Sequence, residues 1–399
     1  MRIVINGAGI AGATLAYWLR RSGHEVLLVE EAPHLRTGGY IVDFWGIGYD
    51  VAERMGLIAR IRELGYQVKE VRFVDDQGRK RGGFATEAIV AQNAGRFTSV
   101  LRSDLAATVY EALDADVETI FADSITAVDE HDGHVTIGFA HASPRDVDLV
   151  VGADGLHSRI RALAFGSDST FAAPLGFHVA AFEVRGYRPR DELVYVVHGK
   201  PGRQISRFAM RDDTTLFLFV FRDEYLGSHA VVTEQDRKAA IAETFSDVDW
   251  ECPRILSAME AVDDVYFDGV TQIRMDRWTK GRIALIGDAA ACVSLLAGEG
   301  SGLAMAEAYV LAGELRQCGD NYSPAFALRT APDALSRTQA ACRGEVRVVV
   351  RTRDAGRPRV SQSRHRPDAI SNVRRSLSRP QFARRYRDAQ LLGRAGLKR

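Results

Sequence analysis

The stretch from residue 2 to residue 30, RIVINGAGIAGATLAYWLRRSGHEVLLVE, decides the fold. It opens with a short β-branched run at 2–6, which leads into the turn Gly7-Ala-Gly9-Ile-Ala-Gly12. Residues 11–22 then place apolar side chains at helical spacing. Residues 25–30 form a second apolar run that ends in acid. The stretch therefore predicts the strand–helix–strand start of a Rossmann-type α/β sheet.

The three glycines of this turn have separate physical uses. Gly7 permits a tight turn, Gly9 lets the backbone approach a pyrophosphate, and Gly12 lets the helix pack closely on the strand. The helix N-terminus offers free amides and a partial positive charge to phosphates. Glu30 ends the second strand, where a ribose hydroxyl is met. A glycine-rich turn without a ligand is the alternative, and the agreement of strand, helix and acid disfavours it.

Two later segments also end an apolar strand in acid. The first, within 148–161, contains Gly152-Ala-Asp154-Gly155, and the second, within 282–290, contains Gly287-Asp288-Ala. An acid at the carboxyl edge of a strand is where ligand hydroxyls are bound in open α/β sheets. Taken singly, each acid is equally well explained as the cap of the next helix.

Together, the three segments resemble the class A flavoprotein monooxygenases, the para-hydroxybenzoate hydroxylase-like family. These proteins carry an N-terminal GxGxxG, a central DG motif and a later GD motif. The resemblance covers about residues 1–325, and within the family it is strongest to the tetracycline- and polyketide-modifying branch. It implies an α/β fold in which a Rossmann-type FAD-binding domain of the GR2 type carries an inserted, mainly antiparallel β-sheet substrate domain.

The pattern along the chain agrees with that division. Between about 170 and 275 short alternating segments indicate an antiparallel sheet, and a buried strand and a helix follow. We expect FAD-binding segments at 1–168 and 276–326, a β-sheet substrate domain at 169–275, and an atypical basic segment at 327–399.

The resemblance also implies roles for individual residues. The acid after the second strand binds the adenosine ribose, which is Glu30 here, with Glu31 adjacent. Arg102 opens a helix and contacts the FAD pyrophosphate, whereas Asp288 binds the ribityl–pyrophosphate region. The DG segment is associated with both FAD and NAD(P)H. The complete set of predicted FAD contacts is Gly7, Gly9, Ala11, Gly12, Glu30, Glu31, Gly39, Arg102, Asp154, Gly155, Gly287, Asp288, Gly298, Gly300 and Ser301.

Two glycine-rich loops complete this expected site. The loop 296–302 matches the family's segment beside the flavin, and the helix that it opens would stabilise negative charge on the reduced flavin. The segment Gly38-Gly39-Tyr40 matches the loop where the isoalloxazine moves between positions. The sequence departs from many relatives at Ala291, where they have histidine, and at Ser294-Leu295, in a segment where they have proline.

The implied function is that of an FAD-dependent monooxygenase. NAD(P)H, bound transiently because no second fingerprint exists, would reduce FAD. O₂ would then form the C4a-hydroperoxide, which hydroxylates an aromatic or polyketide-like small molecule. No catalytic side chain is assigned, because this chemistry needs no nucleophile–base triad. The alternatives are another redox reaction on the same fold, although the halogenase signature WxWxIP is absent, or an FAD-binding protein without turnover.

Substrate contacts are the least determined part of this expectation. Arg207 and Phe208 lie on one strand of the expected second layer, and Phe217 and Phe219 lie on another. Alternation places Phe217 and Phe219 on the same face. A packed sheet core is the more favoured explanation of these side chains, ahead of a substrate wall.

Composition sets further limits. The 399 residues are 46% hydrophobic with a formal net charge of +0. Four separated cysteines without a CxxC pair indicate reduced thiols and no metal site. A first strand that starts at once, without a long apolar run, predicts a cytoplasmic protein with no membrane span.

The basic segment is the anomaly. Residues 329–399 hold 19 basic and 5 acidic residues. A solvated basic tail is one explanation and contact with nucleic acid is another. We expect no nucleic-acid partner. A third is that the reading frame shifts near Phe326, which would replace the C-terminal helix of the relatives.

Overall fold

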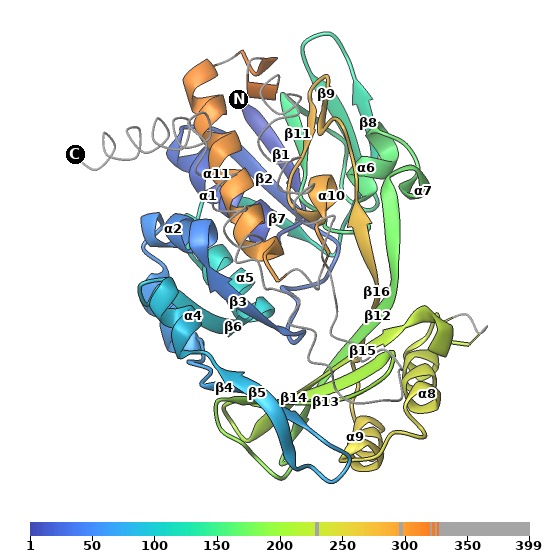
Figure 1. Cartoon of the computed structure of the whole chain (residues 1–399). Coiled ribbons are helices and arrows are strands. Elements are labelled where there is room, and N and C mark those ends of the chain that lie inside the picture. The colour runs from blue at the N-terminus through green and yellow to red at the C-terminus, as the bar shows by residue number, and fades with distance from the viewer. Residues whose placement is uncertain (228–230, 295–297, 320, 324, 327–399) are drawn as a thin grey trace.

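The computed structural model describes residues 1–227, 231–294, 298–319, 321–323 and 325–326. Its first layer is a six-stranded sheet in the order β17-β18-β11-β1-β2-β7 (Figure 1). The strands of this layer are β1 (Arg2–Asn6), β2 (Glu25–Glu30), β7 (Glu118–Phe121), β11 (Leu149–Gly152), β17 (Thr279–Lys280) and β18 (Ile283–Leu285). All neighbouring pairs are parallel except β17–β18, which confirms the expected α/β class.

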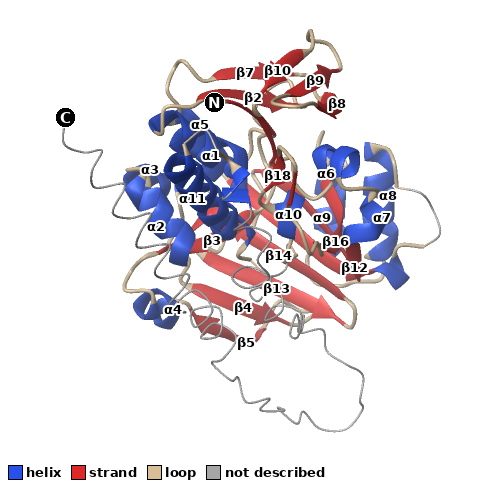
Figure 2. Cartoon of the chain, turned by 90° about the horizontal axis from the view of Figure 1, so that it is seen from above, coloured by secondary structure: helices blue, strands red, loops and turns tan. Residues whose placement is uncertain are grey.

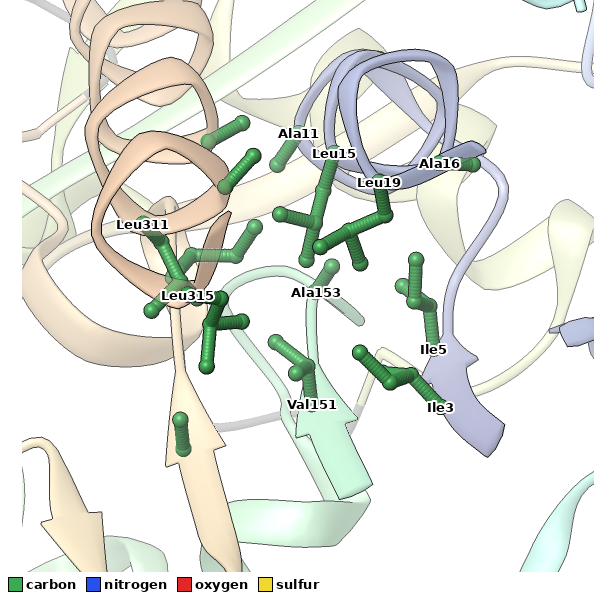
Figure 3. Close-up of a cluster of buried hydrophobic side chains, with 14 of the residues drawn as sticks. Ile3, Ile5, Ala11, Leu15, Ala16, Leu19, Val151, Ala153, Leu311 and Leu315 are labelled. Atoms are coloured by element: carbon green, nitrogen blue, oxygen red, sulfur yellow. The ribbon is translucent and has the colours of Figure 1, made fainter. Parts of the chain in front are cut away.

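Helices cover one face of this sheet because their apolar stripes face it. In α1 (Ile10–Arg21) Leu15 and Leu19 pack over Ile3 and Ile5 of β1 (Figure 3). Leu311, from α11 (Gly300–Cys318), joins the same cluster. Segments about 300 residues apart in the sequence therefore share one core.

The other face of the sheet packs on a smaller layer. The three-stranded sheet β10-β9-β8 lies there, together with several short helices (Figure 2). The elements are β8 (Ile125–Glu130), β9 (Val135–Phe139), β10 (Arg145–Val147), α6 (Arg159–Ala164), α7 (Asp168–Phe171) and α10 (Asp288–Ala291).

A two-stranded ribbon joins the first layer, built on the six-stranded sheet and called the nucleotide-binding layer below, to the second large layer. It pairs β3 (Ile41–Trp45) with β6 (Phe97–Leu101). The segment after β3 forms two helices, because the chain turns at Gly56, which has φ +78°. The helices near the ribbon are α2 (Gly46–Arg54), α3 (Ile58–Leu64), α4 (Glu87–Gln92) and α5 (Arg102–Glu111).

The second large layer is a seven-stranded sheet in the order β16-β12-β15-β14-β13-β4-β5. Its strands are β4 (Glu70–Val74), β5 (Lys80–Ala85), β12 (Ala172–Arg185), β13 (Val194–Lys200), β14 (Arg203–Ala209), β15 (Thr214–Arg222) and β16 (Tyr266–Ile273). All neighbours are antiparallel except β13–β4, so this layer is mainly antiparallel, as expected.

The two faces of this sheet have different neighbours. The outer face packs on α8 (Glu234–Thr244) and α9 (Cys252–Met259), beyond the turn η1 (Asp223–Tyr225). Its inner face packs on the nucleotide-binding layer through Tyr40, Ile41 and Leu101. The inner face therefore lies against the segments that lead into β3 and out of β6.

Two further observations complete the fold. Within the described ranges, no helix has both the length and the apolar character required to cross a bilayer. The hypothesis of a shifted reading frame, and the segment 327–399, lie outside the described residues.

Candidate functional site

The glycine turn after β1 has the geometry that the sequence predicts. Gly7 has φ +103°, and a Cβ there would lie 2.5 Å from the carbonyl oxygen of Ala153. A Cβ at Gly12 would lie 1.9 Å from the carbonyl oxygen of Gly7. At Gly9 nothing lies within 4 Å of that position. The turn is thus closed on the protein side and open at Gly9, which leaves backbone free for a phosphate.

Glu30 lies beside this turn. Its Oε2 accepts a 2.9 Å hydrogen bond from the Ala8 amide, and Oε1 accepts a 3.1 Å bond from the Ala32 amide. Glu30 is half-buried at the end of β2, as predicted for a ribose contact, whereas Glu31 is exposed. The carboxylate therefore already positions the backbone on which a nucleotide would lie.

The carboxylate of Asp154 is occupied by protein. Oδ2 accepts bonds from Asn6 Nδ2 at 2.8 Å and from the Ile160 amide at 3.1 Å. Oδ1 accepts a 2.6 Å bond from Ser158, whose hydroxyl accepts from the Arg161 amide at 3.0 Å and caps α6. Asp154 thus ties the end of β1 to the helix after β11. Next to it, Gly155 has φ +77° and open space at its Cβ position.

The GD motif follows β18 and is anchored from α11. The Gly287 amide donates a 2.6 Å hydrogen bond to Oε2 of the buried Glu307. A Cβ at Gly287 would lie 3.1 Å from the Cβ of Ala11, so the turn packs directly on α1. Asp288 follows, and its Oδ1 lies 3.6 Å from the Cβ position of Gly300 at the start of α11.

The charges of Asp288 and Arg102 act on each other within this site. Burial raises the pKa of Asp288 above its ordinary value, and the nearby Arg102 charge opposes that shift. The thiol of Cys292 donates a hydrogen bond to the Asp288 carboxylate. The pKa of the Cys292 thiol is raised chiefly by burial. Arg102 itself is exposed at the start of α5, and its amide donates a 3.1 Å bond to the Tyr40 carbonyl oxygen. An exposed cation beside a half-buried carboxylate suits a polar ligand that carries both anionic and hydroxyl groups.

Tyr40 connects this pair to the seven-stranded sheet. Its ring lies 5.7 Å from that of Tyr266 on β16. Burial raises the pKa of Tyr40 to about 12, and the charges of Arg102 and Asp288 also act on it. Gly39, the preceding residue, has φ +103° and nothing within 4 Å of its Cβ position. Tyr40 and Tyr266 therefore connect the predicted pyrophosphate contacts with the inner face of the sheet.

The second glycine-rich loop lies at the N-terminus of α11. Gly298 has φ +70° with open space at its Cβ position, and α11 begins at Gly300, followed by Ser301. A Cβ at Gly48 would lie 2.4 Å from the Cα of Gly302, so α2 and α11 cross in close contact. Residues 296 and 297 of the predicted loop lie outside the described residues.

These residues fit an FAD molecule. Open backbone at Gly9, Gly39 and Gly298 faces free space, and the N-termini of α1 and α11 supply amides for anionic groups. Arg102 would supply a cation for the pyrophosphate, and Asp288 would supply a carboxylate for the ribityl hydroxyls.

Sequence reasoning missed one polar residue of this cleft. Asp43 on β3 accepts a 2.6 Å hydrogen bond from the Ser99 hydroxyl on β6. Asp43 keeps exposed surface on one side, and the partial burial of its carboxylate by neighbouring protein raises its pKa. That combination is expected of a side chain that lines a cleft. The available signal was a single acid in the otherwise apolar run 41–45.

The four side chains considered as substrate contacts are placed differently. Phe217 and Phe219 are buried in the outer cluster against α8 and α9, so they belong to the core. Arg207 is also on the outer face, where its guanidinium pairs with Asp191 at 2.7 Å. Phe208 alone lies on the inner face.

Comparison with known proteins identifies the family. A family model for the FAD binding domain matches residues 1–320. An uncharacterized Mycobacterium tuberculosis protein is 37% identical over 333 residues, covering 82% of this chain and 87% of the relative. A flavin-dependent monooxygenase of Legionella longbeachae is 34% identical over 343 residues, covering 82% and 83%.

Solved structures agree with the sequence relatives. The tetracycline destructase Tet(55) superposes with a TM-score of 0.75 at 31% identity, covering 85% of this chain and 86% of that one. Tet(51) gives a TM-score of 0.76 at 30% identity, covering 99% and 96%. The chain therefore belongs to the FAD-binding family of para-hydroxybenzoate hydroxylase-like class A flavoprotein monooxygenases, and its cofactor is FAD.

Proposed function

We propose that this chain uses NAD(P)H and O₂ to hydroxylate an aromatic or polyketide-like small molecule at its FAD. The observation that carries this proposal is the position of Arg102 and Asp288. Their charges act on each other and on both Tyr40 and Tyr266, whose rings lie 5.7 Å apart where the loop before β3 contacts β16. A flavin anchored there would face the inner side of the seven-stranded sheet.

The site residues have complementary roles in this proposal. Arg102 and the amides at the start of α1 hold the pyrophosphate, and Glu30 positions the turn at the adenosine ribose. Asp288 holds the ribityl chain, and the N-terminus of α11 faces the flavin ring. Bound FAD, once reduced by NAD(P)H, supplies the activated oxygen. The protein binds and orients the cofactor and the substrate, and it excludes water.

The inner face of the sheet provides the substrate wall. Tyr266, Ala181, Leu218, Ser206 and Val197 follow one another across five strands on that face. The row combines the tyrosine ring with three aliphatic side chains and one hydroxyl, a mainly apolar surface that suits an aromatic ring system. The tetracycline destructases among its structural neighbours act, by their name, on tetracycline.

Oxygen incorporation tests the proposal. The FAD-loaded chain is incubated with NADPH or NADH, ¹⁸O₂ and a panel of fused-ring phenols that includes tetracycline. Mass spectrometry should show one ¹⁸O atom in a product, together with substrate-dependent consumption of the nicotinamide. Reduction of the flavin without labelled product from any compound would instead favour another redox reaction. An inert flavin would favour a binding protein without turnover.

A further inference from the structure

Asp43 is the charged residue that the β3–β6 ribbon presents to the cleft. Along β3, Val42 and Phe44 pack into the cluster formed with α1, α2 and α5. Successive side chains of a strand point to opposite faces, so Asp43 points away from that cluster, as does Ile41, which packs toward the seven-stranded sheet. The Ser99 hydroxyl holds the carboxylate there.

The wall opposite Asp43 is aromatic and apolar. The negative charge of Asp43 acts on Tyr195, whose pKa is raised mainly by burial. The ring of Tyr195 lies 4.5 Å from the ring of Phe208 on the next strand. On the other side of Tyr195 the same row continues to Val71 and the exposed Phe84. Phe208 is covered by Tyr66, so the open part of this row runs from Tyr195 to Phe84, and a planar molecule placed there would present one edge to Asp43.

The central rows of this wall carry no charge that would compensate Asp43. Three rows of paired residues form the centre of the described inner face and contain no lysine, arginine or histidine, whereas Arg185 and Arg222 lie on the rows beyond them. The rows are Glu183-Leu216-Phe208-Tyr195-Val71-Phe84, Tyr266-Ala181-Leu218-Ser206-Val197-Phe73 and Asp268-Val179-Val220-Gln204-Gly199. Arg102 lies beside Asp288, and Arg222, on the adjoining row, stacks over Phe177 at 5.7 Å. The charged side chains of these three rows are therefore all acidic.

We propose that Asp43 is a specificity-determining residue, which accepts a hydrogen bond from a phenolic hydroxyl of a planar, uncharged substrate and rejects aromatic carboxylates. The inference rests on the proposed function, since it assigns the substrate class of that cleft. The rejection has a simple cause: a substrate carboxylate would bring a second negative charge close to Asp43, where little water screens the repulsion.

A pair of probes that differ by one carboxylate tests this selectivity. 2-Naphthol and 6-hydroxy-2-naphthoate are titrated into the oxidised, FAD-loaded chain at pH 8, without NADPH, and binding is followed by the flavin absorption spectrum. We expect 2-naphthol to bind at least about tenfold more tightly. Asp43→Asn should reduce that preference to about threefold or less, because the amide carries no charge. Ser99→Ala removes the hydrogen bond but keeps the charge, and it should retain most of the preference.

The FAD affinity of the same variants separates a substrate role from a cofactor role. Asp43→Asn should bind FAD within about threefold of the unsubstituted chain. A large loss of FAD affinity with an unchanged probe preference would overturn the inference. Equal or tighter binding of the carboxylate by the unsubstituted chain, or binding of neither probe, would overturn it as well. A chain that takes up no FAD would defeat the proposed function itself, which is a distinguishable result.

Discussion

The Nδ2 of Asn6 donates a 2.8 Å hydrogen bond to Oδ2 of Asp154, and this bond joins the ends of two neighbouring parallel strands. The DG acid is therefore bound by the protein on the side of β1 and α6. The same contact holds the glycine turn against Ala153, where a Cβ at Gly7 would not fit. The geometry of the predicted phosphate site thus depends on a residue that need not touch the phosphate.

Asp154→Ala should destabilise the apoprotein. It removes the acceptor for Asn6, Ser158 and the Ile160 amide, which we expect to lower the free energy of unfolding by about 2 kcal/mol. Ser158→Ala, which removes the helix cap and one of the three hydrogen bonds to Asp154, should cost about 1 kcal/mol. Urea denaturation of the FAD-free chain measures both. An Asp154→Ala apoprotein of unchanged stability would show that the carboxylate serves the ligand alone.

Gly9 and Gly12 should respond oppositely to the same substitution. A Cβ at Gly12 lies 1.9 Å from the Gly7 carbonyl oxygen, so Gly12→Ala should cost about 3 kcal/mol or more and disturb the fold. Gly9→Ala meets nothing within 4 Å and should fold, but its methyl group would occupy the space for the pyrophosphate. We expect at least about a tenfold loss of FAD affinity. Circular dichroism and FAD titration distinguish the two; normal FAD binding by Gly9→Ala would contradict the assigned turn.

Arg102 should contribute to cofactor binding without contributing much to stability. Its side chain is exposed, and its nearby charge is opposite to that of Asp288. Arg102→Ala should weaken FAD binding by about tenfold to a hundredfold while Tm changes little. Arg102→Lys keeps the charge but loses the planar guanidinium. Its FAD affinity should lie between those of the unsubstituted chain and Arg102→Ala. FAD affinity at two salt concentrations measures the effect, and an Arg102→Ala chain with unchanged affinity would place the pyrophosphate elsewhere.

His157 and Asp268 should give a pH-dependent contribution to stability. His157 Nε2 lies 3.2 Å from Asp268 of β16, and the hydrogen bond to that carboxylate raises the pKa of His157. A raised folded-state pKa means that the contribution is fully present below the ordinary histidine pKa and is lost as pH rises through the raised value. The stability difference between the unsubstituted chain and His157→Gln should therefore shrink from pH 6 to pH 9. Because His157 is largely exposed, the effect should be small. A difference that grows with pH would contradict the pairing.

Local patterns predicted the nucleotide-binding layer well. Strand, turn, helix and acid lie within residues 2–30, and the spacing of Gly7, Gly12 and Glu30 is set by backbone geometry. Asp288 was also predictable, because a buried strand ends immediately before it. These features depend on short-range sequence, which a pattern captures.

The remaining features depend on pairing between segments far apart in the sequence, which local patterns do not predict. The hairpin of β4 and β5 pairs residues close in the sequence, yet the pairing of β4 with β13 joins residues more than 100 positions apart. The same applies to Asp43, whose place in the cleft follows from the pairing of β3 with β6. Phe217 and Phe219 were correctly assigned to one face, but which face meets the cofactor depended on where α8 and α9 pack.

The visible absorption spectrum of the purified full chain tests the central claim most directly. After incubation with FAD and removal of excess cofactor, the account predicts flavin bands at about one FAD per chain, since one glycine turn and one GD motif form one site. Anaerobic NADPH or NADH should then bleach those bands. A folded chain that remains colourless after incubation with FAD would contradict the account.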